Sequence, residues 1–422
     1  MTEQEDMQIE KIGIIQLVTR MLSLRTLPHI VAVALLSSVL MLFVNSNEEF
    51  VAMSFISLAL SYLFIGMLSN NDRVTNLITL DHESIMASPV KMTFMGFKIT
   101  ILPLALSALI LIIMWNLLGG SENKWISPGL AMLFIGWSIG QAVSFRTGIV
   151  EWLKNGLGDA KLHTYREKLS IASQVIIVQG FALIIIWLGQ IASGKETTFI
   201  DALISGIIFI IISIALQMLT LWLTRDERES AGAEKGLASF SFKWMIVAQL
   251  FITWHAFSAY RRYFMEPSTI STLIEEITLM AFTVLFAVWS LTTYTVGDGK
   301  RLVSEKAALP IAISFGYAYA GSVSMLAGTF GSLKEVILFG HLLTIATTIA
   351  IINSTLRKSR KTSGFIQKAK TVEISREDAS DNEKTNPEND EESWQEQKDV
   401  DWEKGDDIGD GTNWENDIEV LD

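Results

Sequence analysis

The sequence has no cysteine, and only 7 of its 422 residues are proline and only 18% are charged. Without cysteine the chain has no disulfide framework, no thiolate zinc site, no iron–sulfur ligation and no cysteine nucleophile. The scarcity of charge goes with a hydrophobic content of 50% and a positive mean hydropathy of +0.37. This composition differs from that of ordinary soluble domains and predicts a membrane protein.

Acidic residues gather at the C-terminal end of the chain. Residues 371–422 hold 20 Asp and Glu against 4 Lys and Arg, whereas residues 1–370 hold 25 against 29. The tail has almost no aliphatic residues and cannot bury a core, so we predict that it is disordered. Its tryptophans lie among acids, which suits short anchors for a basic partner surface, although a purely solvating tail explains them equally well. They are Trp394, Trp402 and Trp414.

Long apolar stretches recur along the rest of the chain. A helix needs about 20 mostly apolar residues to cross a bilayer, and ten stretches meet or approach that length. Because backbone polar groups in lipid must be satisfied within the segment, these stretches predict a helical bundle and not a barrel. They are 28–44, 50–68, 99–118, 126–145, 169–192, 202–223, 241–260, 277–295, 308–328 and 336–353.

The basic residues predict the orientation of these spans. With a cytoplasmic N-terminus, the internal segments before the tail hold 24 Lys and Arg. The external segments hold only 5, namely Lys124, Lys195, Arg261, Arg262 and Lys334. Positive residues are enriched in cytoplasmic loops, so we expect a cell-membrane protein with both termini in the cytoplasm.

A different element precedes the first span. On a helical wheel of residues 7–27, Gln16, Thr19, Arg20 and Ser23 share one side, and Leu17 and other apolar residues face away. This pattern predicts a helix that lies in the cytoplasmic interface. The alternative is a cytoplasmic extension of the first span, kinked at Pro28.

Together these features predict an all-α, polytopic membrane protein with three parts. Residues 1–27 form the interfacial amphipathic helix, and residues 28–356 form a domain of about ten transmembrane helices. Residues 357–422 form a basic juxtamembrane stretch and the disordered acidic tail. The lipid bilayer is therefore the first expected partner, and the sequence also allows a homodimer.

The loop between the second and third stretches carries the most specific local pattern. An acidic pair, Asp81 and Glu83, precedes a short apolar turn, then a Ser-Pro-Val step and a downstream Gly-x-Lys that ends at Lys98. This loop resembles the cytoplasmic loop of ABC-2-type transporter permeases. The positions that carry the resemblance are Glu83, Ile85, Met86, Ser88, Pro89, Val90, Gly96 and Lys98.

The resemblance implies a coupling helix that docks on a separate ATPase subunit, with Asp81, Glu83, Ser88, Pro89 and Lys98 as its marked residues. Proline after Ser88 stops one helix and begins another, and acids near a helix start suit its positive dipole end. The match covers about 20 residues, and ten spans exceed the six that are common in that family. A weaker echo, Glu305 to Pro310, follows the eighth span.

Ionisable residues also gather near the expected outer ends of the later spans. The group comprises His255, Arg261, Arg262, Glu275, Glu276 and His341. Ionisable groups inside a membrane are costly, so this cluster predicts a polar substrate site or a proton relay. The alternative is that the charged residues anchor the spans in the headgroup region and that each histidine is a satisfied packing residue.

Two further patterns predict how the spans pack. The ninth stretch is rich in Gly, Ala and Ser, which predicts a central helix, with Tyr317 and Tyr319 facing a cavity or simply packing. Glutamines within the spans are more typical of bonds to neighbouring helices than of a substrate site. They are Gln141, Gln174, Gln179, Gln190, Gln217 and Gln249.

The sequence has no P-loop, nucleophile elbow, zincin helix or dinucleotide loop. We therefore expect no enzyme, no catalytic residue, no cofactor, no metal and no nucleic-acid partner, and any ATP hydrolysis has to come from another subunit. Three functions stay open. They are a permease that moves a lipid-like or hydrophobic substrate with a separate ATPase, an autonomous secondary transporter of two five-helix halves, and a scaffold that recruits partners through its acidic tail.

Overall fold

The computed structural model describes residues 13–43, 48–80, 89–118, 126–154, 157, 161, 164–193, 198–265, 269–293, 295–296, 300–301, 303–330 and 333–383. The chain divides into two units, Met1–Gly364 and Phe365–Asp422. The regular elements of the described residues are helices, apart from one antiparallel pair of two-residue strands, β1 (Thr295–Val296) and β2 (Lys300–Arg301). The predicted all-α class is confirmed apart from this short pair.

Each predicted apolar stretch corresponds to helical structure. The helices are α1 (Ile14–Met21), α2 (Leu27–Phe43), α3 (Glu48–Leu68), α4 (Asp72–Ile78), α6 (Pro89–Leu118), α7 (Ile126–Leu153), α8 (Glu167–Ala192), α9 (Phe199–Ser205), α10 (Ile207–Leu223), α11 (Arg225–Gly232), α12 (Lys235–Phe264), α13 (Thr269–Thr293), the 3-10 helix η1 (Glu305–Ala307), α14 (Ala308–Phe330) and α15 (Leu333–Glu383). Within the described residues, five helices are long and apolar enough to cross a membrane. A sixth span is added if α9 and α10 count as one.

The sixth stretch is broken where α9 meets α10, with a bend of 71°. Gly206 ends α9, and its N–H bonds back to the carbonyl of Ala202. A Cβ at this position would lie 2.3 Å from Cγ1 of Ile186 on α8. The glycine therefore lets α8 approach the bend closely.

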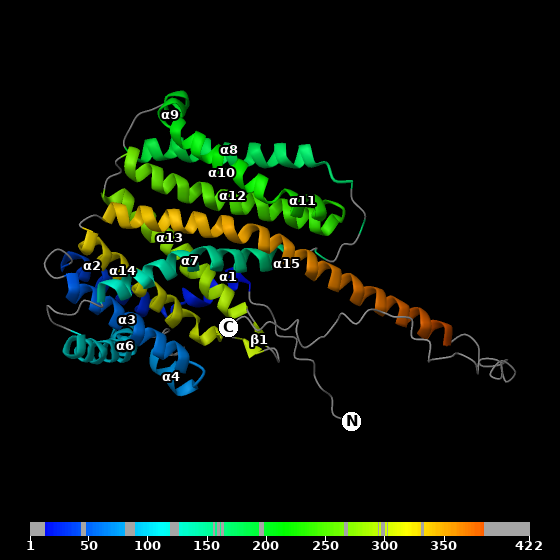
Figure 1. The fold of residues 1–422 in the computed structure, drawn as a ribbon. Helices are drawn as coiled ribbons and strands as arrows, with labels where there is room; N and C mark the ends of the chain where they lie inside the picture. Colours follow the sequence, from blue (N-terminus) through cyan, green and yellow to red (C-terminus); the bar gives the residue numbers. More distant parts are fainter. Residues whose placement is uncertain are drawn as a thin grey trace. The chain divides into compact units, whose positions relative to one another are not determined.

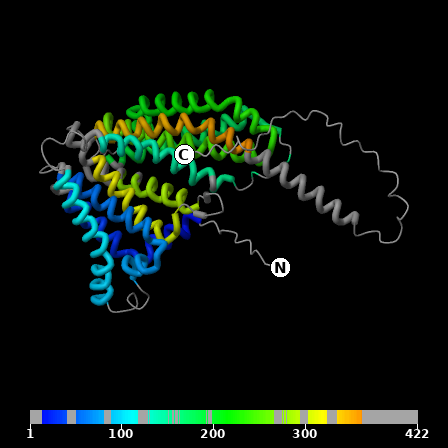
Figure 2. Tube along the Cα trace, turned by 60° about the horizontal axis from the view of Figure 1, so that its bottom comes forward, coloured from blue at the N-terminus to red at the C-terminus, as the bar shows by residue number. Residues whose placement is uncertain are grey.

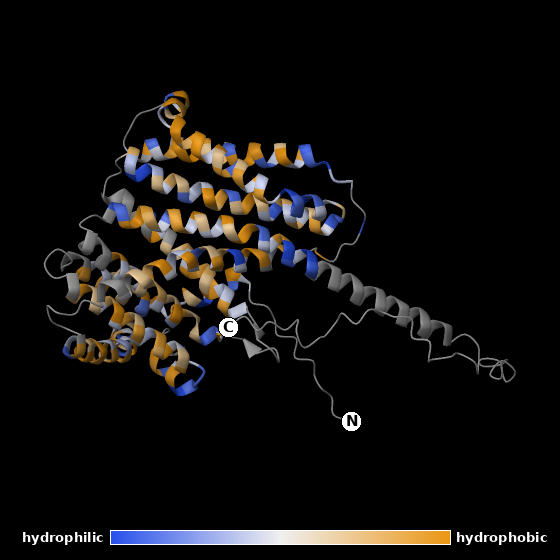
Figure 3. Cartoon of the chain, in the orientation of Figure 1, coloured by the Kyte–Doolittle hydropathy of each residue, from blue (hydrophilic) through white to orange (hydrophobic). Residues whose placement is uncertain are grey.

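The helices of the first unit form two groups that meet along α7 and α13 (Figures 1 and 2). The first group comprises α2, α3, α6 and α14, and its core includes Phe55, Tyr62 and Tyr317. The second comprises α8, α10, α12 and the first part of α15, and its core includes Trp244 and Phe257. Figure 3 shows apolar residues along the middle of these helices and hydrophilic residues at α11 and on α15 beyond its apolar part.

The predicted central position of the ninth stretch is confirmed, since α14 packs against α3, α7 and α13. Small residues allow the close contact with α3. A Cβ on Gly321 would lie 2.9 Å from Cβ of Phe55, and a Cβ on Gly66 would lie 2.7 Å from a side-chain carbon of Ile311. Tyr317 is 1% exposed and packs between the rings of Phe55 and Tyr62, so it has a packing role.

The N-terminal helix is shorter than the predicted helix over residues 7–27. The structure has α1 over Ile14–Met21, followed by turns at 22–26 before α2 begins at Leu27. The turn forms because Thr26 Oγ1 bonds the carbonyls of Met21 and Ser23, which competes with a continuous helix. The alternative of one helix kinked at Pro28 is also wrong, since Pro28 lies in the first turn of α2, where proline is tolerated.

The C-terminal boundary also differs from the expectation. No helix break occurs at residue 357, and α15 runs on to Glu383, past residue 371 where disorder was predicted. The sequence has no proline between Pro310 and Pro387, so nothing in the backbone forces the helix to stop earlier. Residues 384–422, with the three tail tryptophans, lie outside the described residues.

The contact of α3 with α14 leads to a stability prediction. Gly321→Ala places a methyl group against Phe55, whereas Gly316→Ala, on the same helix, meets nothing within 4 Å. Both changes replace a helical glycine by alanine, which stabilises the helix by up to about 1 kcal/mol. Only Gly321→Ala also overpacks the contact with α3, and this costs about 1–3 kcal/mol. We expect Gly321→Ala to lower, and Gly316→Ala to keep or raise, the thermal unfolding midpoint in mild detergent. Equal midpoints would contradict the tight contact.

Candidate functional site

The predicted outer cluster is a buried polar network formed by α12, α13 and α15. His255, Ser258 and Arg262 recur at a spacing of three and four residues, which places them on one face of α12. They meet Glu275 of α13 and His341 of α15. The side chains are almost fully enclosed, with His255 1%, Arg262 3% and His341 5% exposed.

Hydrogen bonds join the two histidines to Arg262. His255 Nδ1 lies 2.8 Å from His341 Nδ1, and Arg262 Nη1 lies 2.9 Å from His341 Nε2. A guanidinium has donors only, so His341 Nε2 accepts and the proton of His341 is on Nδ1. His341 Nδ1 then donates to His255 Nδ1, and the proton of His255 is on Nε2. Both imidazoles are therefore neutral in this arrangement.

His255 Nε2 is the end of this chain of bonds. It is buried and has no hydrogen-bond partner among the described residues. The imidazole packs edge-on against Phe251, with ring centroids 4.4 Å apart. A buried donor without an acceptor is costly, so this nitrogen is the atom of the network best placed to bind an acceptor group from outside the described part of the chain.

Glu275 balances the positive charges of the network. Its Oε2 lies 3.1 Å from Nη1 of Arg261, and its Oε1 accepts a hydrogen bond from Ser258 Oγ. Arg262 Nη1 also donates to the carbonyl of Ser258, 3.1 Å away. These contacts tie α13 to the end of α12 and supply a counter-charge inside the bundle.

The structure thus brings together five of the six residues that the sequence marked at this site. They are His255, Arg261, Arg262, Glu275 and His341. The side chain of Glu276 lies outside the described residues. Ser258 is not among the residues predicted from the sequence, although its position three residues after His255 on the same helical face was the available signal. No described group of three or more His, Cys, Asp or Glu is arranged to hold a metal ion.

A second polar network consists of glutamines and joins α8, α10 and α12. Gln179 Nε2 donates to Gln217 Oε1 at 2.8 Å, and Gln217 Nε2 donates to Gln249 Oε1 at 3.3 Å. Gln249 Nε2 in turn donates to Thr220 Oγ1 at 3.0 Å. The prediction that span glutamines bond to neighbouring helices is confirmed for these three residues.

The loop that resembles a coupling helix lies mostly outside the described residues, since Asp81, Glu83 and Ser88 fall in the segment 81–88. Pro89 begins α6, as its fixed φ angle predicts, and Lys98 is exposed on the same helix. The residues just before the loop accept hydrogen bonds from side chains near the start of α2. Arg25 Nε donates to the carbonyl of Leu80 at 2.9 Å, which joins the turn before α2 to the start of the loop.

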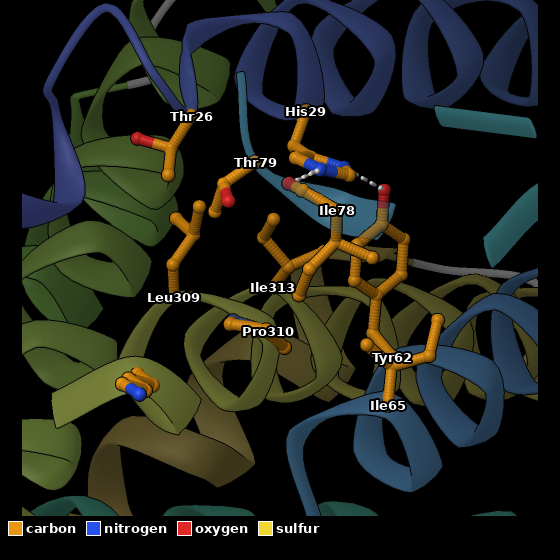
Figure 4. Close-up of a pocket in the computed structure, with 10 residues that line it drawn as sticks. Thr26, His29, Tyr62, Ile65, Ile78, Thr79, Leu309, Pro310 and Ile313 are labelled. Carbon is orange, nitrogen blue, oxygen red and sulfur yellow. Dashed lines mark hydrogen bonds between the residues drawn. The ribbon is translucent and has the colours of Figure 1, made fainter. Parts of the chain in front are cut away.

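His29 makes a second contact with the residues before the loop, and Figure 4 shows its bonds to Ile78 and Tyr62. Its Nε2 lies 2.7 Å from the carbonyl oxygen of Ile78, and its Nδ1 lies 3.1 Å from Oη of Tyr62 on α3. The adjoining cavity, between these residues and Pro310 of α14, has a volume of about 30 Å³. That space holds one or two water molecules and no substrate, so the group around His29 joins helices.

Ion pairs join the same region to η1, the short helix just before α14. Asp72, at the start of α4, lies 2.6 Å from Nζ of Lys306, and Arg20 of α1 pairs with Glu305. The ammonium of Lys306 lowers the pKa of the Asp72 carboxyl. Because the folded-state pKa is depressed, this pair contributes at neutral pH and its contribution is lost as the pH falls through that pKa.

No protein-family model, no curated protein and no solved structure matches this chain.

Breaking the ion pair inside the outer network should destabilise the bundle. Glu275→Gln keeps the shape of the side chain but leaves Arg261 buried without this counter-charge, which typically costs about 3–5 kcal/mol. Glu229→Gln is the matched control, because Glu229 pairs with Arg225 on the exposed face of α11, where solvent screens the pair and it contributes little to stability.

We expect the first change to lower the free energy of unfolding in detergent and the second to leave it nearly unchanged. Equal small effects would mean that solvent reaches Arg261 and that the network is not enclosed.

Proposed function

We propose that this chain is a ten-span membrane protein with both termini in the cytoplasm. The apolar helices and the distribution of Lys and Arg support this topology. Contacts between distant segments support it as well, since they join segments expected on the same side. Arg360 lies 3.3 Å from Glu227, and Lys306 pairs with Asp72, all four on the cytoplasmic side.

Cysteine labelling tests the topology on a clean background, because the natural chain has no cysteine. An impermeant thiol reagent applied to intact cells should label Lys334→Cys, which is exposed at the expected outer end of α15. It should leave Ser380→Cys unlabelled until the cells are opened. Labelling of Ser380→Cys in intact cells would mean that the orientation is reversed.

We propose further that the protein is a transport permease driven by a separate ATPase subunit. The observation that carries this proposal is the attachment of the residues just before the loop 81–88 to the first span. Arg25 holds Leu80, and His29 holds Ile78, so both contacts join the residues just before the loop to α2 and the turn that precedes it. The chain carries no P-loop of its own, which is why the energy has to come from a partner.

The attachment provides a route for force. A partner that pushes on the loop displaces Ile78 and Leu80, and their bonds pull on the start of α2. The pair of Asp72 with Lys306 carries the same displacement to α14, the central helix. Because packed helices move as rigid bodies and not by continuous deformation, a push at the loop shifts whole helices.

The apolar character of the bundle supports a lipid-like or hydrophobic substrate. The described helices present many large hydrophobic side chains on their outer surface, among them Ile176, Trp222 and Phe94. A groove of about 310 Å³ between α10, α12 and α15 is lined almost entirely by apolar side chains. A substrate that crosses along the protein therefore meets mainly apolar surface.

Copurification in mild detergent tests the partnership. Glu83→Arg reverses a charge at the expected docking surface, and losing such a contact typically costs about 2–5 kcal/mol, enough to release a partner held at micromolar affinity. Glu335→Arg is the control, because Glu335 is exposed at the opposite, external end of the bundle. We expect a nucleotide-binding subunit to copurify with the wild type and the control but not with Glu83→Arg.

A second variant separates docking from coupling. Arg25→Gln leaves the loop surface intact but removes the bond to Leu80, so the subunit should still copurify while transport falls. If no nucleotide-binding subunit copurifies with the wild type, or if it copurifies equally with Glu83→Arg, the coupling assignment fails.

One observation favours an autonomous carrier as the second candidate. The bend of 71° at Gly206 breaks the sixth span, and carriers of two inverted halves use broken helices in corresponding positions. The corresponding helix of the first half is α2. It is continuous from Leu27 to Phe43, which counts against matching breaks in the two halves. The buried histidine pair supplies the ionisable groups that such a carrier needs, so failure of the copurification test would make this the leading proposal.

A further inference from the structure

A groove opens between α10, α12 and α15 on the side of α12 next to the buried network. Its volume is about 310 Å³, which is at the lower end of the range of small-molecule sites. Ala256 and Ala259 of α12 form a floor of small, buried residues. Leu216 of α10 and Leu342 and Ile345 of α15 contribute to the walls.

The groove faces the surroundings of the bundle and not its interior. Leu342 is 51% exposed, and Tyr263, at the end of α12, is 43% exposed. The lining is apolar apart from the tyrosine hydroxyls. In a membrane such a groove is in contact with acyl chains, and small side chains on its floor leave room for a chain to enter.

A basic residue contacts one of the side chains that line the groove. Nζ of Lys334, in the first turn of α15, lies over the ring of Tyr263 at 5.0 Å from the centroid. Tyr263 itself lines the groove, so this ammonium is at the groove's rim. Its neighbour Glu335 is exposed and does not line the groove. An apolar slot with an ammonium at the end of a span fits a molecule with a hydrocarbon chain and an anionic head.

We propose that this groove binds one acyl chain of a phospholipid, with the phosphate of the headgroup at Lys334. A lysine at the end of a membrane helix reaches the headgroup region, where a phosphate is the available anion. This inference rests on the proposed membrane location but not on the ATPase partner. The copurification test can therefore fail while the lipid site is confirmed. Likewise, the lipid site can be overturned while a nucleotide-binding subunit copurifies.

Photo-crosslinking of the full-length protein in lipid nanodiscs tests the site. The probe is phosphatidylglycerol with a diazirine in one acyl chain, and crosslinked peptides are identified by mass spectrometry. Ala259→Leu fills the groove floor and should lower crosslinking to the peptide around Leu342 by about tenfold relative to the wild type. Ala108→Leu, at an exposed alanine on α6, is the matched control and should leave it unchanged.

The headgroup contact needs its own comparison. Diacylglycerol with the same photoactive chain lacks the phosphate, so it should crosslink less at Leu342 than phosphatidylglycerol does. Lys334→Gln, which keeps most of the length of the lysine side chain, should remove that difference without affecting folding at its exposed position. The proposal is overturned if crosslinks are spread over α6 and α15 in proportion to exposure, or if Ala259→Leu has no effect on them.

Discussion

A polar group surrounded by hydrocarbon has to be satisfied by another group of the protein, and the described part of this structure depends on that requirement. The helices satisfy their own backbones, and several polar side chains within the bundle form hydrogen bonds with one another. Gln179, Gln217 and Gln249 form a chain across three helices, and Glu275 takes up the charge of Arg261. Each of these bonds also joins two particular helices. The polar residues therefore select one arrangement among those that apolar packing allows.

Close packing supplies the second determinant, because apolar side chains gain little by leaving lipid for one another. The gain comes from contact at short range, which small residues permit. Gly321 lets α14 approach Phe55 of α3, and Gly206 lets the bend after α9 approach Ile186 of α8. The first contact makes α14 the central helix, and the second places the broken helix against its neighbour. Both glycines are therefore explained by what lies beside them.

Much of the helical architecture could be predicted from the sequence, since long apolar stretches have few other solutions in a membrane. The ends of the helices were harder to predict, because local hydrogen bonds determine where a helix begins and ends. Thr26 ends the N-terminal helix early through its own hydroxyl, and nothing after residue 357 compels α15 to stop. Neither effect changes hydropathy, which is the signal that marked the spans.

The outer network was predicted as a set of residue types, and the structure adds the order of its bonds. The sequence marked His255 and His341, which are 86 positions apart, but it could not show that their Nδ1 atoms face each other. Ser258 was missed because a serine in a span is usually bonded to its own helix. Here it reaches Glu275 of the next helix instead, a choice that only the packing of α12 on α13 determines.

The two candidate sites are connected by α14. The helix begins two residues after Lys306, which pairs with Asp72 beside the loop, and its Val323 packs in one buried cluster with Val336 of α15. Because α15 also carries His341, which bonds Arg262, the helix that packs against α14 holds part of the outer network. Under the proposed function, α14 is thus a physical link between the region of the loop and the buried histidines.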